Sequence, residues 1–143
     1  MSDFLRYFSP GSLSEEPSVP DPTRYIDGMT APALLTADDL VRLQPSDKRT
    51  ELVRGRMIER ELAGFLHGNV ASTVAVRLHA FVRKNLLGHV LAAGTGFKLF
   101  TNPDTVRAPD VSFVRHDRIP HPMPTGFAPF APDLTVEVLS PDD

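Results

Sequence analysis

The sequence predicts an α/β or α+β fold in which one long helix covers one face of a sheet. Three observations lead to this prediction. Residues 66–87 carry apolar side chains every three or four positions, as in an amphipathic helix. Residues 50–60 have the pattern of a β-hairpin. Residues 108–114 and 134–140 are apolar, strand-like segments that each contain one acid. The order of hairpin, helix and strands favours a helix packed on one sheet face.

Length and composition fit one globular domain. The chain has 143 residues, of which 41% are hydrophobic and 23% charged. A formal charge of −3 argues against indiscriminate coating of nucleic acid, although a local basic patch stays open. The absence of cysteine excludes disulfides and thiolate metal sites. Because no segment resembles a membrane span or a secretory signal, we expect a cytoplasmic protein without membrane contacts.

The N-terminal segment differs in composition from the rest. Residues 1–33 are rich in Pro, Ser and Asp without sustained periodicity, so we expect a flexible tail, followed by a domain over residues 34–143. As an alternative to a flexible end, the apolar residues at the very start of the chain form a docking patch for a partner. Met29 is an alternative translation start.

A short helix and a hairpin come next. Thr36 is the expected N-cap of a helix that ends near Leu43, before Pro45. The hairpin turns at Arg54 and Gly55. We expect Leu52, together with Met57 or Ile58, to point inward. Its cations (Arg54, Arg56 and Arg60) form either a solvated edge or a patch that faces phosphate.

The long helix is expected to end at Leu87, with Gly88 at its C′ position. Its apolar stripe comprises Leu66, Val70, Val74, Leu78, Phe81 and Val82. His67 lies within this stripe, where a histidine is usually a core residue. It gains a functional meaning only if the helix crosses the sheet that carries the two acids. His79 falls on the outer side.

Short strands and a long loop complete the chain. We expect strands at 89–93 and 97–100, joined by a plain turn at Gly94-Thr95-Gly96, and then a loop over 115–132. The loop histidines, His116 and His121, have no carboxylate at ligand spacing, so we expect them on the surface.

Asp110 and Glu137 are the main functional candidates. Asp110 follows Pro109 at the start of one strand, and Glu137 lies in the middle of the other. Burial of an unpaired carboxylate costs several kcal/mol, so such a group is normally paired, protonated or bound to a metal. If the two strands are neighbours, about 5 Å apart, both acids can share one divalent cation. The alternative is a Glu137 ion pair with Arg107 or Arg77 and an Asp110 that serves a turn.

Three segments and His67 resemble successive blocks of the Uma2 family, within the restriction-endonuclease-like PD-(D/E)XK superfamily. The segments are TELVRGRMIE at 50–59, APDVSFV at 108–114 and PDLTVEVLSP at 132–141. The resemblance runs from about Leu35 to the C-terminus. It implies an αβββαβ core, here with an additional N-terminal helix and β-hairpin, and metal-dependent cleavage of DNA phosphodiesters.

The resemblance also implies residue roles. Asp110 and Glu137 are expected to hold Mg²⁺ or Mn²⁺, with the Val138 carbonyl as a further ligand, while Glu51 and His67 orient the site or a second water. The expected phosphate contacts are Arg54, Arg56, Lys98 and Arg107.

Two departures from the family pattern lead to alternatives. Leu139 occupies the position of the superfamily lysine, for which a lysine from the following helix is thought to stand in. The chain ends at Asp143, so we expect the last helix and strand to be missing, the endonuclease to be weakened or inactive, and a homodimer as one consequence. The alternatives are a non-catalytic binding or assembly protein that retains the nuclease fold, and another metal hydrolase that uses the same acids.

Overall fold

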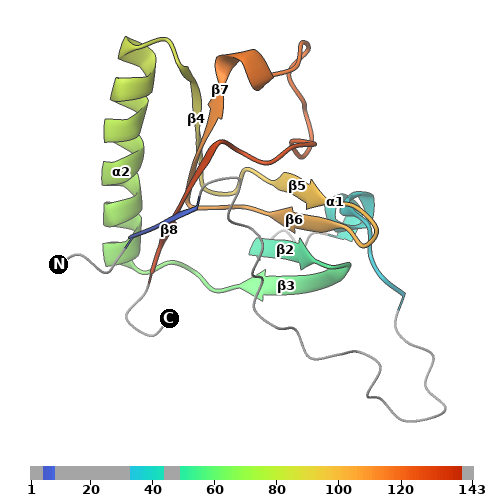
Figure 1. Cartoon of the computed structure of the whole chain (residues 1–143). Coiled ribbons are helices and arrows are strands. Elements are labelled where there is room, and N and C mark those ends of the chain that lie inside the picture. The colour runs from blue at the N-terminus through green and yellow to red at the C-terminus, as the bar shows by residue number, and fades with distance from the viewer. Residues whose placement is uncertain (1–4, 9–32, 44–48, 140–143) are drawn as a thin grey trace.

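The computed structural model describes residues 5–8, 33–43 and 49–139, and of residues 5–8 only the backbone. The elements are β1 (Leu5–Phe8), α1 (Ala37–Leu43), β2 (Arg49–Val53), β3 (Arg56–Arg60), α2 (Phe65–Lys84), β4 (Gly88–Ala92), β5 (Phe97–Phe100), β6 (Thr105–Arg107), β7 (Val111–Arg115), the 3₁₀ turn η2 (His116–Arg118) and β8 (Leu134–Val138). They form two antiparallel sheets, in the orders β1-β8-β7-β4 and β3-β2-β6-β5. Figure 1 shows α2 beside the first sheet and α1 beside the second. The predicted mixed α/β class is confirmed.

Helix α1 begins at a reciprocal cap, as predicted. Thr36 Oγ1 accepts the Asp39 N–H at 3.1 Å, and the Thr36 N–H donates to Asp39 Oδ2 at 2.9 Å. The Ala37 N–H donates to Asp104 Oδ2 at 2.8 Å, so the helix start is also tied to the turn before β6. Leu40 is fully buried in the core that α1 shares with the second sheet.

The predicted hairpin turn is confirmed. Arg54 and Gly55 have φ of 49° and 74°, as a two-residue type I′ turn requires, and Leu52 lies opposite Met57. Leu52 is fully buried and Met57 packs against the same core, whereas Ile58 is 43% exposed. Of the two alternatives for the inward residue, Met57 is therefore correct.

Helix α2 ends three residues earlier than predicted. It stops at Lys84, because Leu86 adopts a φ of 54° and breaks the helical path. Gly88 is not its C′ residue but the first residue of β4, where its φ is 154°. A Cβ at Gly88 would lie 2.1 Å from the Val114 carbonyl oxygen, so the close approach of β4 to β7 requires glycine there.

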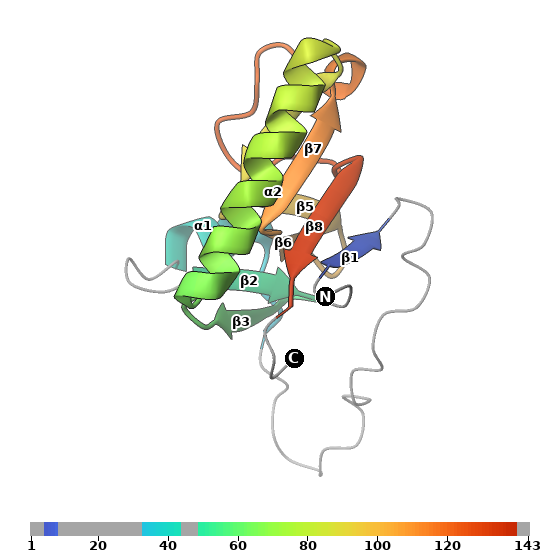
Figure 2. The same cartoon turned by 90° about the vertical axis from the view of Figure 1, so that its left-hand side faces the viewer.

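Helix α2 crosses the first sheet, in contact with β4, β7 and β8 (Figure 2). The predicted stripe faces this sheet, but only Val82 is fully buried, while Val74 and Leu78 are half-buried. Leu66 and Phe81 are 63% and 58% exposed, so these two residues of the predicted stripe are not buried against the sheet. Val82 is therefore the one fully buried residue of α2.

The start of the chain corrects one expectation. We predicted a flexible tail over residues 1–33, but β1 pairs with β8 as an antiparallel edge strand, with Arg6 opposite Glu137. A four-residue strand without alternation has no sequence signature of its own, because its hydrogen bonds depend on the partner strand. Residues 9–32 lie outside the described part of the chain, and the boundary of the domain at residue 34 stays a prediction.

The loop before β8 is fixed at one point. Ala128 bridges to β5, accepting from the Lys98 N–H at 2.8 Å and donating to the Gly96 carbonyl at 2.9 Å. The Phe127 ring lies directly over Gly96, where a Cβ would lie 2.3 Å from the ring. The predicted turn at Gly94-Thr95-Gly96 is therefore also the place where this loop docks.

Candidate active site

Asp110 and Glu137 lie side by side, because β7 and β8 are neighbours. The strands pair antiparallel with Val111 opposite Val136, and the continued register places Asp110 opposite Glu137. Asp110 Oδ2 accepts the Val138 N–H at 2.9 Å across this junction. Asp110 is only 8% exposed. The two strands are thus neighbours, as the sharing of one cation by both acids requires.

His67 contacts this pair from the helix above. Its Nε2 lies 3.1 Å from Asp110 Oδ2, and its side chain is 18% exposed. The first turn of α2 is held over the end of β7, so the histidine of the apolar stripe points at an acid and not into a hydrophobic core. An imidazole in this position fixes the orientation of the Asp110 carboxylate.

Glu51 reaches the same place from the second sheet, and each of its two carboxylate oxygens accepts a hydrogen bond from a protein donor. Its side chain is 5% exposed, and Oε1 accepts the Ala108 N–H at 2.9 Å. Oε2 accepts Arg60 Nε–H at 3.0 Å and lies 2.9 Å from Arg107 Nε. The Arg107 Nε–H is not aligned with that oxygen, so this contact is an ion pair without a hydrogen bond, and the buried N–H is unpartnered.

The surroundings of Glu137 raise its pKa. Burial, the largest cause, and the nearby charges of Asp110 and Glu51 raise the pKa of Glu137, whereas Arg60 and Arg107 act in the opposite direction. Arg107 pairs with Glu51 and not with Glu137, and none of the described side chains forms an ion pair with Glu137. The alternative of a Glu137 ion pair with Arg107 or Arg77 therefore finds no support.

The donor set fits a hard divalent cation. No three His, Cys, Asp or Glu side chains in the described part of the chain are grouped as a ready metal cage. Mg²⁺ does not need one, since it is usually held by one or two carboxylates and keeps several waters. Asp110 and Glu137 supply two such carboxylates from neighbouring strands. The Val138 carbonyl stays a predicted ligand.

The predicted phosphate contacts do not gather at the acids as a group. Lys98 Nζ pairs with Asp104 at 2.8 Å, beside α1, while Arg54 lies in the hairpin turn and Arg56 directly after it. Of the four, only Arg107 lies at the acids. Arg60 was expected in the cationic patch of the hairpin and not at the acids, although the two-residue turn fixes the register that puts Arg60 diagonally across from Glu51.

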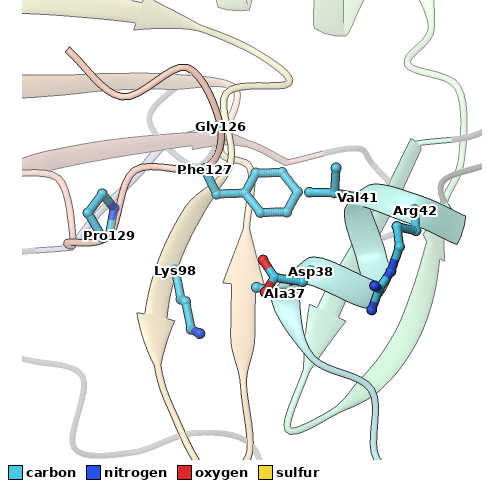
Figure 3. A pocket seen from close by; sticks show the side chains of 8 residues that line it. All are labelled: Ala37, Asp38, Val41, Arg42, Lys98, Gly126, Phe127 and Pro129. Atoms are coloured by element: carbon cyan, nitrogen blue, oxygen red, sulfur yellow. The ribbon is translucent and has the colours of Figure 1, made fainter. Parts of the chain in front are cut away.

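A cleft in the described structure lies away from the acids. It has a volume of about 530 Å³ and is bordered by α1, Lys98 and the loop that carries Phe127. Figure 3 shows the Phe127 ring pointing toward Val41 across this cleft. Its lining includes none of the four predicted catalytic residues, so the cleft is separate from the acid pair.

Comparison with known proteins identifies one family and one solved fold. The family model Uma2, described as “Putative restriction endonuclease”, matches residues 37–143. A crystal structure described as a putative nuclease belonging to DUF820, from Anabaena variabilis ATCC 29413, superposes with a TM-score of 0.61 at 24% sequence identity. The match covers 76% of this chain and 60% of that one, and at this identity it establishes the fold. No curated protein matches the chain. Neither helix of the described residues is long and apolar enough to cross a membrane.

Proposed function

The chain belongs to the Uma2 family of restriction-endonuclease-like proteins, and from this premise we propose that it hydrolyses DNA phosphodiesters with Mg²⁺ or Mn²⁺ held by Asp110 and Glu137. The observation that carries the proposal is the pair itself. Two acids from neighbouring strands lie opposite each other, one is fixed by His67, and the other has a raised pKa. Restriction-endonuclease-like proteins generally use divalent metal ions, and DNA is the substrate that a nuclease family implies.

Each residue has a distinct part in this proposal. His67 and the Val138 N–H both contact Asp110 Oδ2, which leaves Oδ1 for a cation. Glu137, opposite Asp110 in the neighbouring strand, would supply the second carboxylate ligand. A bound divalent cation supplies a Lewis acid for the phosphate and a more acidic water.

Plasmid cleavage tests the proposal. We expect wild type to nick supercoiled DNA with Mg²⁺ or Mn²⁺, and Asp110→Asn and Glu137→Gln to lose about 100-fold or more, as expected for a lost acid–base or metal-binding group. Asp38→Asn is the matched control, because it makes the same chemical change at an exposed acid on α1. Cleavage that is equal in all four proteins would rule out the acid pair as the site.

Metal binding gives an independent readout. At a concentration 100 times its dissociation constant, Mg²⁺ is expected to stabilise wild type by about 2.7 kcal/mol. Calorimetry and thermal melts of wild type, Glu137→Gln and Asp38→Asn would show whether this effect depends on Glu137.

A non-catalytic protein with the nuclease fold is the second candidate, favoured by Leu139 at the position of the superfamily lysine. It predicts a folded wild type that neither binds Mg²⁺ nor cleaves DNA, and no effect of Asp110→Ala or Glu137→Ala. Turnover of small phosphodiesters without DNA cleavage would favour another metal hydrolase. The cytoplasmic location and the homodimer stay predictions, as does the activity of the whole protein, since the chain spans 60% of the length of its solved relative.

A further inference from the structure

We propose that Arg60 and Arg107, both anchored on Glu51, bind the scissile phosphate and stabilise the negative charge that develops on it during cleavage. The inference rests on the proposed nuclease function. It adds Arg60 to the site and makes Glu51 a positioning residue that holds two guanidinium groups in place.

The contacts of the two guanidinium groups leave their outer ends available. Both approach Glu51 Oε2 through Nε, at 3.0 Å and 2.9 Å. Their terminal nitrogens make no hydrogen bond with the residues that the structure describes. Glu51 is 5% exposed, whereas the Arg60 and Arg107 side chains are 44% and 38% exposed. The inner ends are therefore fixed in the protein while the outer ends face solvent.

The terminal nitrogens, and not the Nε groups, are the donors available to a ligand. The Arg107 Nε is buried and lies 2.9 Å from Glu51 Oε2, so it holds the guanidinium in place as an ion pair. The terminal N–H groups suit a phosphate, because guanidinium groups bind phosphate with paired, charge-assisted hydrogen bonds.

The charges explain why the arginines belong beside the acids. Both guanidinium groups pair with Glu51, which reaches the two acids from the second sheet. The three carboxylates and two arginines carry a net charge of −1, which a divalent cation would turn into +1. A net positive site favours an anionic diester and a transition state with still more charge on the phosphate oxygens. Lys98 cannot share this role, because it pairs with Asp104 beside α1.

DNA binding and cleavage should be measured separately on one set of variants. The set is Arg60→Gln, Arg107→Gln, Arg60→Lys, Arg107→Lys and Glu51→Gln. Arg83→Gln is the control, because it removes one exposed guanidinium at the far end of α2. Binding of a labelled duplex oligonucleotide is followed by anisotropy with Ca²⁺, and kcat and KM are followed with Mg²⁺.

We expect Arg60→Gln and Arg107→Gln to weaken duplex binding or lower kcat by about 10-fold to 100-fold, the range for a lost hydrogen bond to a charged group. The lysine variants should recover part of the loss, because they keep the charge and the pair with Glu51 but lose the planar fork. Glu51→Gln should lower kcat while Mg²⁺ affinity, measured by calorimetry, changes little.

The outcomes separate the two proposals. If wild type cleaves DNA and both glutamine variants behave like Arg83→Gln, the arginine proposal is overturned and the nuclease stands. If wild type binds the duplex without cleaving it, a loss of binding in both variants supports the phosphate contact and removes the proposed catalysis. No duplex binding by wild type overturns the arginine proposal. Should Arg107→Gln fail to fold, Arg107→Lys carries the test.

Discussion

Asp104 and Glu137 are two buried or half-buried acids of the same chain with opposite electrostatics. Asp104 accepts from Lys98 at 2.8 Å and from the Ala37 N–H at 2.8 Å, and these hydrogen bonds hold its pKa below the ordinary value. Glu137 has no such pair among the described side chains, and burial with the nearby Asp110 and Glu51 raises its pKa. The partners, and not the residue type, make Asp104 a structural anchor and leave Glu137 without an ion pair among the described side chains.

The surroundings of the two acids also differ, in how many neighbouring side chains are fully buried. Around Asp104, α1 and the second sheet enclose a core in which Leu40 and Leu52 have no exposed surface. Around Glu137, α2 lies on the first sheet with only Val82 fully buried among its residues. The well-packed region is expected to supply stability and the less packed one to supply the proposed site.

The largest expected effect on stability comes from the enclosed core. Leu52→Ala should lower the free energy of unfolding by about 3 kcal/mol, because it removes buried methyl groups and leaves a cavity. Val76→Ala on α2, where the side chain is 68% exposed, should change it by less than about 0.5 kcal/mol. Urea unfolding followed by circular dichroism measures both. Equal losses would mean that the two regions do not differ in packing.

Removal of the structural anchor should have the next largest effect. Asp104→Asn weakens the pair with Lys98 and the bond to the α1 start, so we expect a loss of about 2 kcal/mol. Mg²⁺ affinity should stay unchanged in this variant. A loss of metal binding without a loss of stability would assign Asp104 to the site and overturn the comparison. Asp38→Asn is the control, because it makes the same chemical change at an exposed acid of α1.

The cap of α1 should contribute less. Thr36→Ala removes the hydroxyl that accepts the Asp39 N–H, with an expected cost of about 1 kcal/mol. Thr36→Ser keeps the acceptor and should recover most of that cost. If both variants lose the same amount in thermal melts, the Oγ1 hydrogen bond does not stabilise the helix.

The smallest expected effect is a difference between Glu137 and Asp104 in how their contributions to stability change with pH. Since the folded pKa of Glu137 is raised, its favourable contribution is present below its ordinary value of 4.5 and is lost as pH rises through the folded pKa. Glu137→Gln without metal should therefore be as stable as wild type or more so at pH 7, by under about 0.5 kcal/mol because solvent screens a partly exposed group. This advantage should shrink toward pH 4.5. Asp104, with a lowered pKa, should instead lose its contribution as pH falls below 3.8. Melts from pH 8 down to below the ordinary Asp104 pKa of 3.8 test both signs.

Local signals in the sequence determined several elements correctly. Thr36 and its acids specified the start of α1, and the two turn residues specified the β2–β3 register. The alternation around Asp110 and Glu137 located both strand segments, and the motif blocks identified the family. These features depend on residues a few positions apart, so periodicity and turn chemistry suffice to find them.

Tertiary structure decided the rest, because it depends on partners far apart in the chain. The pairing of β1 with β8 has no signal in residues 5–8, and the close passage of β4 beside β7 is what requires glycine at Gly88. The contact of Glu51 with Arg107 forms only when the hairpin meets the end of β6. The sequence determined which acids the chain carries and on which strands. Only the three-dimensional arrangement decided which acids pair with a cationic side chain and which two lie side by side in neighbouring strands, since that depends on charges brought together by folding.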